Sequence, residues 1–145
     1  MTNDERFKEL LTRLHAEVFK PRGWSKEGQN FRFFQPDGLC RIVNFQKSAY
    51  NDAKVLSFYI NLGIYWEPQP EIMNRRFKEY ECRVRGRVHG NVEKWNIFEG
   101  RDMDKLFLEL KTLIEGKVMD RFDTLTSRKE ALLRYGASGK RIYWM

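Results

Sequence analysis

The chain has no long apolar run and few cysteines or histidines. Its 145 residues have a mean hydropathy of -0.67, and no stretch approaches the roughly 18 uninterrupted apolar residues that a membrane-spanning helix requires. The N-terminus is charged and amphipathic and lacks the apolar centre of a signal peptide. These absences predict a soluble, cytoplasmic protein that does not associate with a membrane.

Cysteine and histidine are also too sparse for the sites they usually form. Cys40 and Cys82 belong to no Cys-x-x-Cys motif and lie in stretches expected to be strands, where cysteine is usually a small buried side chain. His15 and His89 are far apart in the sequence, whereas a metal site needs several ligands brought together. We therefore expect no disulfide, no metal site and no cofactor.

Motifs of the common catalytic classes are missing. No serine lies in the Gly-x-Ser-x-Gly turn of an α/β-hydrolase. The segment GASGK at 136–140 lacks the early glycine and the late hydroxyl of a phosphate-binding loop. The closest approach to an acid–base pair is Glu79 and Glu81, expected on one face of a strand, where ion pairs with neighbouring arginines are the expected role. The sequence favours a protein that is not an enzyme.

Acidic residues are outnumbered by basic ones, 20 against 27, which gives a net charge of +7. Between Arg121 and Met145 six basic residues and two acids contribute +4 of this charge. Such an excess favours acidic partners, nucleic acid among them, without identifying one.

The stretch from Lys54 to Trp66 alternates as a long half-buried strand does. Successive strand side chains point to opposite faces, so one row enters a core and the other occupies the second face of a sheet. The inward row is Leu56, Phe58, Ile60, Leu62, Ile64 and Trp66, and the mixed row is Val55, Ser57, Tyr59, Asn61, Gly63 and Tyr65.

Helical periodicity marks both ends of the chain. Thr2 opens a capping-box pattern before an apolar stripe that should end near Pro21. Asp102 and Ser127 are the expected N-caps of two further helices, and Gly116 should weaken the end of the first of them.

The order of elements predicts an α+β fold in a single domain, 1–145. It comprises an N-terminal helix, an antiparallel sheet of about five strands, and two C-terminal helices packed on one face. The connections between the first strands are too short for the crossovers that parallel strands require, so these strands should be antiparallel. The segment 95–98 is expected to be a loop anchored to the core, and the apolar tail 142–144 should pack on the body or on a partner. Besides the long strand, strands are expected at Trp24–Lys26, Asn30–Gln35, Leu39–Lys47 and Glu81–Val88.

Four stretches carry a resemblance to a known protein family: PRGW at 21–24, NFR at 30–32, IVNFQKS at 42–48 and INLGI at 60–64. They resemble domain of unknown function family 4304, over roughly the whole chain. Trp24 stands where phenylalanine is expected and keeps an aromatic anchor. The resemblance implies a bacterial origin and a single α+β domain, and it carries over no activity.

The mixed row of the long strand and its neighbour form the first candidate site. Amides and phenols offer neutral donors and acceptors beside flat apolar area, as specific pockets do. The alternative is that these side chains satisfy one another, or lie under a loop or the tail. The candidate ligand-binding residues are Asn44, Gln46, Tyr59, Asn61 and Tyr65.

A row of arginines forms the second candidate site. They alternate along the strand expected at Glu81–Val88 and would stand about 6.6 Å apart, near the spacing of phosphates in a nucleic-acid strand. Charged residues are, however, common on exposed strands, where they oppose aggregation. The candidate anion- or nucleic-acid-binding residues are Arg83, Arg85, Arg87, Lys140 and Arg141.

The sequence therefore predicts a non-catalytic binding domain that uses the open face or groove of its sheet to contact a protein or small ligand. The competing hypothesis is binding of single-stranded RNA or DNA through the arginine row and the basic C-terminal region. Steep salt dependence would indicate nucleic-acid binding, because contact with the phosphate backbone releases counterions.

Overall fold

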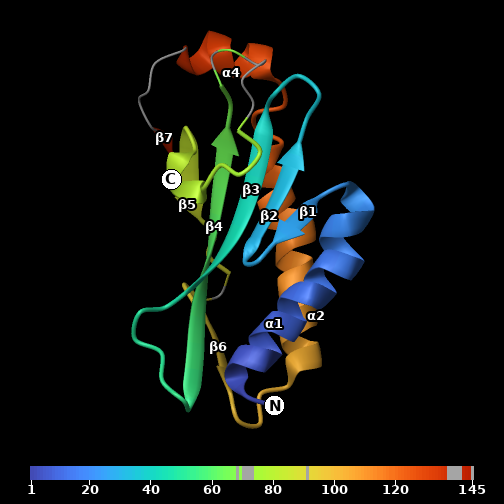
Figure 1. The fold of residues 1–145 in the computed structure, drawn as a ribbon, viewed down its shortest axis with the longest axis vertical. Coiled ribbons are helices and arrows are strands. Elements are labelled where there is room, and N and C mark those ends of the chain that lie inside the picture. The colour runs from blue at the N-terminus through green and yellow to red at the C-terminus, as the bar shows by residue number, and fades with distance from the viewer. Residues whose placement is uncertain (68, 70–73, 91, 137–141, 145) are drawn as a thin grey trace.

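Seven strands and the helices that cover them form an α+β fold in the described part of the chain, which confirms the predicted class (Figure 1). The computed structural model describes residues 1–67, 69, 74–90, 92–136 and 142–144. In chain order the elements are α1 (Asn3–Leu14), β1 (Ser25–Glu27), β2 (Asn30–Phe34), β3 (Cys40–Lys47), β4 (Val55–Tyr65), β5 (Val84–Arg87), β6 (Trp95–Phe98), α2 (Met103–Leu113), α3 (Met119–Phe122), α4 (Arg128–Tyr135) and β7 (Ile142–Tyr143). Turns of π-helix lie at His15–Phe19 and Ile114–Val118, and 3-10 turns lie at Lys20–Arg22 and Glu79–Glu81.

The sheet is built on β4, its longest strand. The strand order is β1-β2-β3-β4-β5-β7, with antiparallel neighbours except for the parallel pair of β5 and β7. β3 pairs with 58–65 along one edge of β4. On the other edge β5 pairs with 61–64 and β6 with 55–58. β5 and β6 therefore follow one another along the same edge, and Figure 1 shows β4 running past both.

Two strands were not predicted from the sequence. β6 occupies the segment expected to be a loop, and β7 lies in the apolar tail. Each is too short for its alternation to stand out, since β6 has four residues and β7 has two. The strand expected at Glu81–Val88 begins only at Val84, because the 3-10 turn at Glu79–Glu81 precedes it.

The apolar row of β4 faces the helices, as predicted. Each of its six residues is at most 3% exposed. α1 and α2 lie together across this face (Figure 1), and the ring of Phe7 in α1 lies 5.2 Å from that of Phe58, centroid to centroid. The opposite side of the sheet, on which the mixed row of β4 lies, is here called the polar face.

The expected N-caps are confirmed, but the effect of Gly116 is not. The side chains of Thr2, Asp102 and Ser127 each accept a hydrogen bond from the backbone N–H three residues ahead. The helix continues past Gly116 to Phe122 through the π-helical turn. Its apolar stripe also continues, and burial of side chains such as Phe122 outweighs the roughly 1 kcal/mol that a helical glycine costs.

The apolar tail packs on the body of the protein, one of its two expected placements. Ile142 and Trp144 lie against the core, and the ring of Trp144 meets Phe122 edge-on. Gly86 makes room for this contact, because a Cβ there would stand 3.1 Å from the Cβ of Trp144. No helix in the described ranges has the length and apolar character needed to cross a membrane.

Candidate ligand-binding groove on the polar face

Four polar side chains form a row that crosses the polar face from strand to strand. The register places Asn30, Asn44, Asn61 and Arg87 opposite one another on β2, β3, β4 and β5. Arg87 Nε donates to Asn61 Oδ1 at 3.0 Å. Asn61 Nδ2 donates to Asn44 Oδ1 at 3.0 Å, and Asn44 Nδ2 donates to Asn30 Oδ1 at 2.7 Å. We call these four residues the polar row.

Arg87 is held on several sides at the end of this row. Its Nη2 donates to Gln46 Oε1 at 3.3 Å, and its guanidinium carbon lies 4.1 Å from the ring centroid of Tyr59. Asn61, which is only 5% exposed, also donates to Gln46 Oε1 at 2.9 Å. A planar guanidinium that is both stacked and hydrogen-bonded keeps few orientations. The protein therefore presents Arg87 in a fixed position.

A groove of about 250 Å³ opens beside Arg87. It lies where the polar row, β5 and the C-terminal strand β7 meet, and it is lined by Gln46, Asn61, Glu79, Arg85, Gly86, Arg87 and Tyr143. Charged, amide and phenol groups thus converge on a volume that would hold a small molecule or one or two side chains.

Glu79 and Arg85 form an ion pair in the wall of the groove. Arg85 Nε and Nη2 donate to the two carboxylate oxygens of Glu79, each at 3.0 Å. The hydrogen bonds that Arg85 donates to the Glu79 carboxylate raise the pKa of Arg85, so this guanidinium stays charged. Glu79 and Glu81 do not share a strand face as expected, because both lie in the 3-10 turn, where Glu81 accepts from the backbone N–H of Lys78.

Arg83 does not share the groove with the other two arginines of the expected row. It precedes β5, and its Nε donates to the carbonyl oxygen of Trp66 at 2.8 Å. Its guanidinium carbon also lies 5.5 Å from the Trp66 ring centroid, and Trp66 belongs to the core on the helix side. The structure thus brings Arg85 and Arg87 together and directs Arg83 elsewhere.

The segment 74–82, here called the cover segment, lies over one end of the polar face. Its Phe77 ring stacks on the Tyr65 ring with centroids 4.5 Å apart, which leaves Tyr65 7% exposed. The hydroxyl of Tyr65 donates to Glu67. Tyr65 is therefore separated from the other four candidate ligand residues, which lie around Arg87 and outside the cover: Asn44, Gln46, Tyr59 and Asn61.

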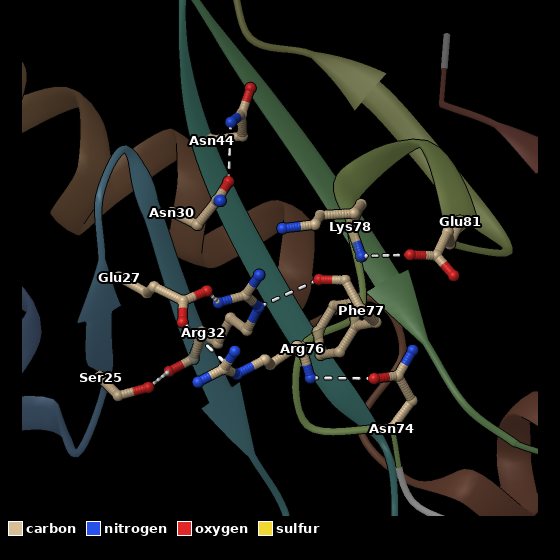
Figure 2. A network of polar contacts seen from close by, with 10 residues as sticks. All are labelled: Ser25, Glu27, Asn30, Arg32, Asn44, Asn74, Arg76, Phe77, Lys78 and Glu81. Carbon is tan, nitrogen blue, oxygen red and sulfur yellow. Dashed lines mark hydrogen bonds and ion pairs between the residues drawn. The ribbon is translucent and has the colours of Figure 1, made fainter.

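Arg32 of β2 fastens the cover segment to the sheet. Figure 2 shows its guanidinium between Glu27 and the carbonyl of Phe77, to which Nη1 and Nε donate at 3.2 and 3.0 Å. The Arg32 side chain is nearly fully buried, and its Nη2 makes no hydrogen bond to a described residue. A buried cation is strongly destabilising without partners, so the cover segment and β1 depend on each other through Arg32.

Cys40 lies beneath the cover segment and Cys82 belongs to it, both in one buried cluster with Phe77, and we predict that neither reacts with a thiol reagent in the folded protein. Burial raises the pKa of Cys40 to about 11 and raises that of Cys82 well above its ordinary value. At pH 8 only about one Cys40 in a thousand would be a thiolate, the reactive form. Labelling with Ellman's reagent should be negligible in buffer and complete in urea; fast labelling of either cysteine in buffer would contradict this prediction.

Three residues of the site were not among the sequence candidates: Asn30, Glu79 and Tyr143. Asn30 could have been found, because the five-residue loop between Phe34 and Cys40 sets the register that places it opposite Asn44. Glu79 and Tyr143 reach the groove from a 3-10 turn and from the tail, which strand alternation does not place. The candidates Lys140 and Arg141 lie outside the described residues.

The family described as Domain of unknown function (DUF4304) matches residues 15–124, which include β1 to β6 and most of the residues around the groove. Comparison with curated proteins and with solved structures gives no match. Because the family match spans well over half of the sequence, this chain belongs to the DUF4304 family.

Proposed function

We propose that this protein is a non-catalytic binding domain and that the groove beside Arg87 contacts a small ligand or side chains of a partner protein. The observation that carries the proposal is the fixed position of Arg87. Asn61, Gln46 and Tyr59 hold this exposed arginine in place, and Asn61 is itself held by Asn44. Preorganised polar groups bind more tightly because less freedom is lost on binding.

The groove offers donors in excess of acceptors. Gln46 uses its oxygen within the site, while its Nε2 makes no hydrogen bond to a described residue. Asn61, in contrast, uses both its oxygen and its nitrogen within the protein. A ligand would therefore contact the Gln46 amide and the outer edge of the Arg87 guanidinium, while Asn61 hydrogen-bonds to both side chains and holds them in position.

A fragment screen followed by NMR tests this proposal. The screen would use anionic, cationic and neutral compounds and the assigned ¹H–¹⁵N spectrum of the whole chain. We expect bound fragments to shift the signals of Gln46, Asn61 and Arg87 together. Asn61→Ala, which removes the support of Arg87, should weaken binding about tenfold or more.

Asn96→Ala is the matched control. Asn96 lies in β6, opposite Ser57 of β4, and does not line the groove. It should leave fragment binding unchanged. Fragments that shift only signals elsewhere, or a complete lack of binding, would contradict the proposal.

Binding of single-stranded nucleic acid is the competing function, favoured by the net charge of +7 and by the stacking of Arg87 on Tyr59. For about three phosphate contacts, raising the salt from 50 to 200 mM should weaken such binding roughly 20-fold. Fluorescence anisotropy with labelled single-stranded RNA and DNA measures this dependence. Arg83→Glu combined with Arg85→Glu should abolish binding of this kind, and retention by the folded double variant would exclude it.

A further inference from the structure

One edge of the Arg87 guanidinium makes no hydrogen bond to a described residue, and Arg87 lines the groove. A guanidinium carries five N–H groups. Arg87 donates from Nε to Asn61 and from Nη2 to Gln46, which uses two of these N–H groups along one edge of the planar group. Its Nη1 makes no hydrogen bond to a described residue. One N–H of Nη1 and the remaining N–H of Nη2 therefore form a parallel pair at the outer end.

Such a pair matches the two oxygens of a carboxylate. Fork-to-fork contacts of this kind are shorter and stronger than neutral hydrogen bonds, and they fix the plane of the bound group. Tyr59 and Asn61 already fix the plane of the Arg87 guanidinium. The Nε2 amide of Gln46, beside the same guanidinium, adds a neutral donor on one side.

The charge of the groove favours a group with a single negative charge. Arg85 and Arg87 contribute two positive charges, and Glu79 neutralises one of them through its two hydrogen bonds to Arg85. Glu79 would also repel a doubly charged phosphate in the same groove, because the attraction and the repulsion act over similar distances. A carboxylate would meet one net positive charge.

We infer that the groove recognises a carboxylate, which Arg87 binds end-on with help from Gln46. This inference rests on the proposed binding function and names the chemistry that the groove selects. The same carboxylate chemistry occurs in a free organic acid and in the acidic side chain of a partner protein. A volume of about 250 Å³ accommodates either.

Titration of the ¹⁵N-labelled full chain tests the inference, with the Arg87 Nε–Hε signal and the Gln46 side-chain amide as reporters. The probes are sodium acetate, sodium succinate, a blocked tripeptide with one glutamate, disodium methyl phosphate and N-methylacetamide, all at pH 7.5 and at constant ionic strength set with chloride. We expect saturable shifts with acetate and succinate and at least tenfold weaker binding of methyl phosphate, which carries two negative charges at pH 7.5. Tighter binding of succinate than of the peptide identifies a free acid, and the reverse order identifies a partner side chain.

Arg87→Lys keeps the charge but removes the fork, and it should weaken acetate binding about tenfold, followed through the Gln46 amide. Arg76→Lys is the control, because Arg76 is largely exposed in the cover segment and does not line the groove. It should bind acetate as the natural chain does.

The outcomes separate this inference from the proposed function. If N-methylacetamide or other neutral fragments bind the groove and carboxylates do not, the carboxylate inference is wrong while the binding function stands. Equal binding of methyl phosphate and acetate would also overturn the inference, because the groove would then bind anions without selecting a carboxylate. If no probe and no fragment shifts these signals, both proposals fail.

Discussion

Gly63→Ala should lower the free energy of unfolding by about 3 kcal/mol, the upper part of the range for overpacking a core. A Cβ at Gly63 would stand 2.5 Å from Cys82 Sγ, 2.8 Å from Cys82 Cβ and 3.1 Å from Ile42 Cγ2. These neighbours lie in a buried cluster between β3, β4 and the cover segment, so none can move into open space. Urea unfolding followed by fluorescence would measure the loss.

A double variant identifies the contact that causes the loss. In Gly63→Ala with Cys82→Ala the clash with Sγ disappears and the one with Cβ remains, so the double variant should lose less stability than the two single variants added together. Gly116→Ala is the control, because a Cβ there meets no atom within 4 Å. It should leave stability unchanged or raise it by up to about 1 kcal/mol. Strict additivity of the first two substitutions would contradict this explanation.

Phe77→Ala should cost about 4 kcal/mol, as truncation of a fully buried phenylalanine usually does. The side chain is 0% exposed, stacks on Tyr65, and meets the Phe34 ring edge-on at 6.1 Å. Its ring centroid also lies 5.5 Å from the guanidinium carbon of Arg32. Its removal would leave a cavity over the end of the polar face and loosen the cover segment.

Two measurements would detect this loosening. Urea unfolding gives the loss of stability, and labelling with Ellman's reagent should become measurable at Cys82 in the folded protein, because the cover segment carries this residue. Tyr80→Ala is the control in the same segment, since Tyr80 is 59% exposed and exposed substitutions usually change stability by less than about 0.5 kcal/mol. A small loss with Phe77→Ala, or equal losses with both variants, would contradict this account.

The sequence was sufficient to predict the long strand, its inward row and the three helix caps. Each of these follows from contacts within a short stretch of chain, where periodicity and capping chemistry act directly. The sequence did not place Cys82 correctly. Cys82 and Val84 are two residues apart, which in a continuous strand would place both side chains on the same face of the sheet. Instead, Cys82 caps the 3-10 turn and packs against Gly63 on the polar face. The strand begins only at Val84, after this turn, so strand alternation does not extend back to Cys82.

Part of the candidate site could also be predicted from the sequence. Asn44, Gln46 and Asn61 were grouped correctly on one face, because β3 and β4 are neighbours joined by a short connection. Arg87 was assigned to a different candidate site, and its place opposite Asn61 depends on how the chain returns after the excursion from 66 to 83. No turn chemistry fixes that return, so only the folded structure shows that the two candidate sites meet.

The hydrogen bonds of the polar row all run in one direction, from Arg87 to Asn30, and Arg87 sets that direction. A guanidinium only donates hydrogen bonds, so Asn61 must turn its oxygen toward Arg87 and its nitrogen toward Asn44. Asn44 in turn directs its nitrogen to Asn30. Without the cation on β5, the three amides could flip together into the reverse order. Any event that draws Arg87 away from Asn61 can therefore change the side-chain orientation of Asn30, roughly 14 Å away across three strand spacings. The change would pass through rotations of the side-chain amides, while the backbone stays in place.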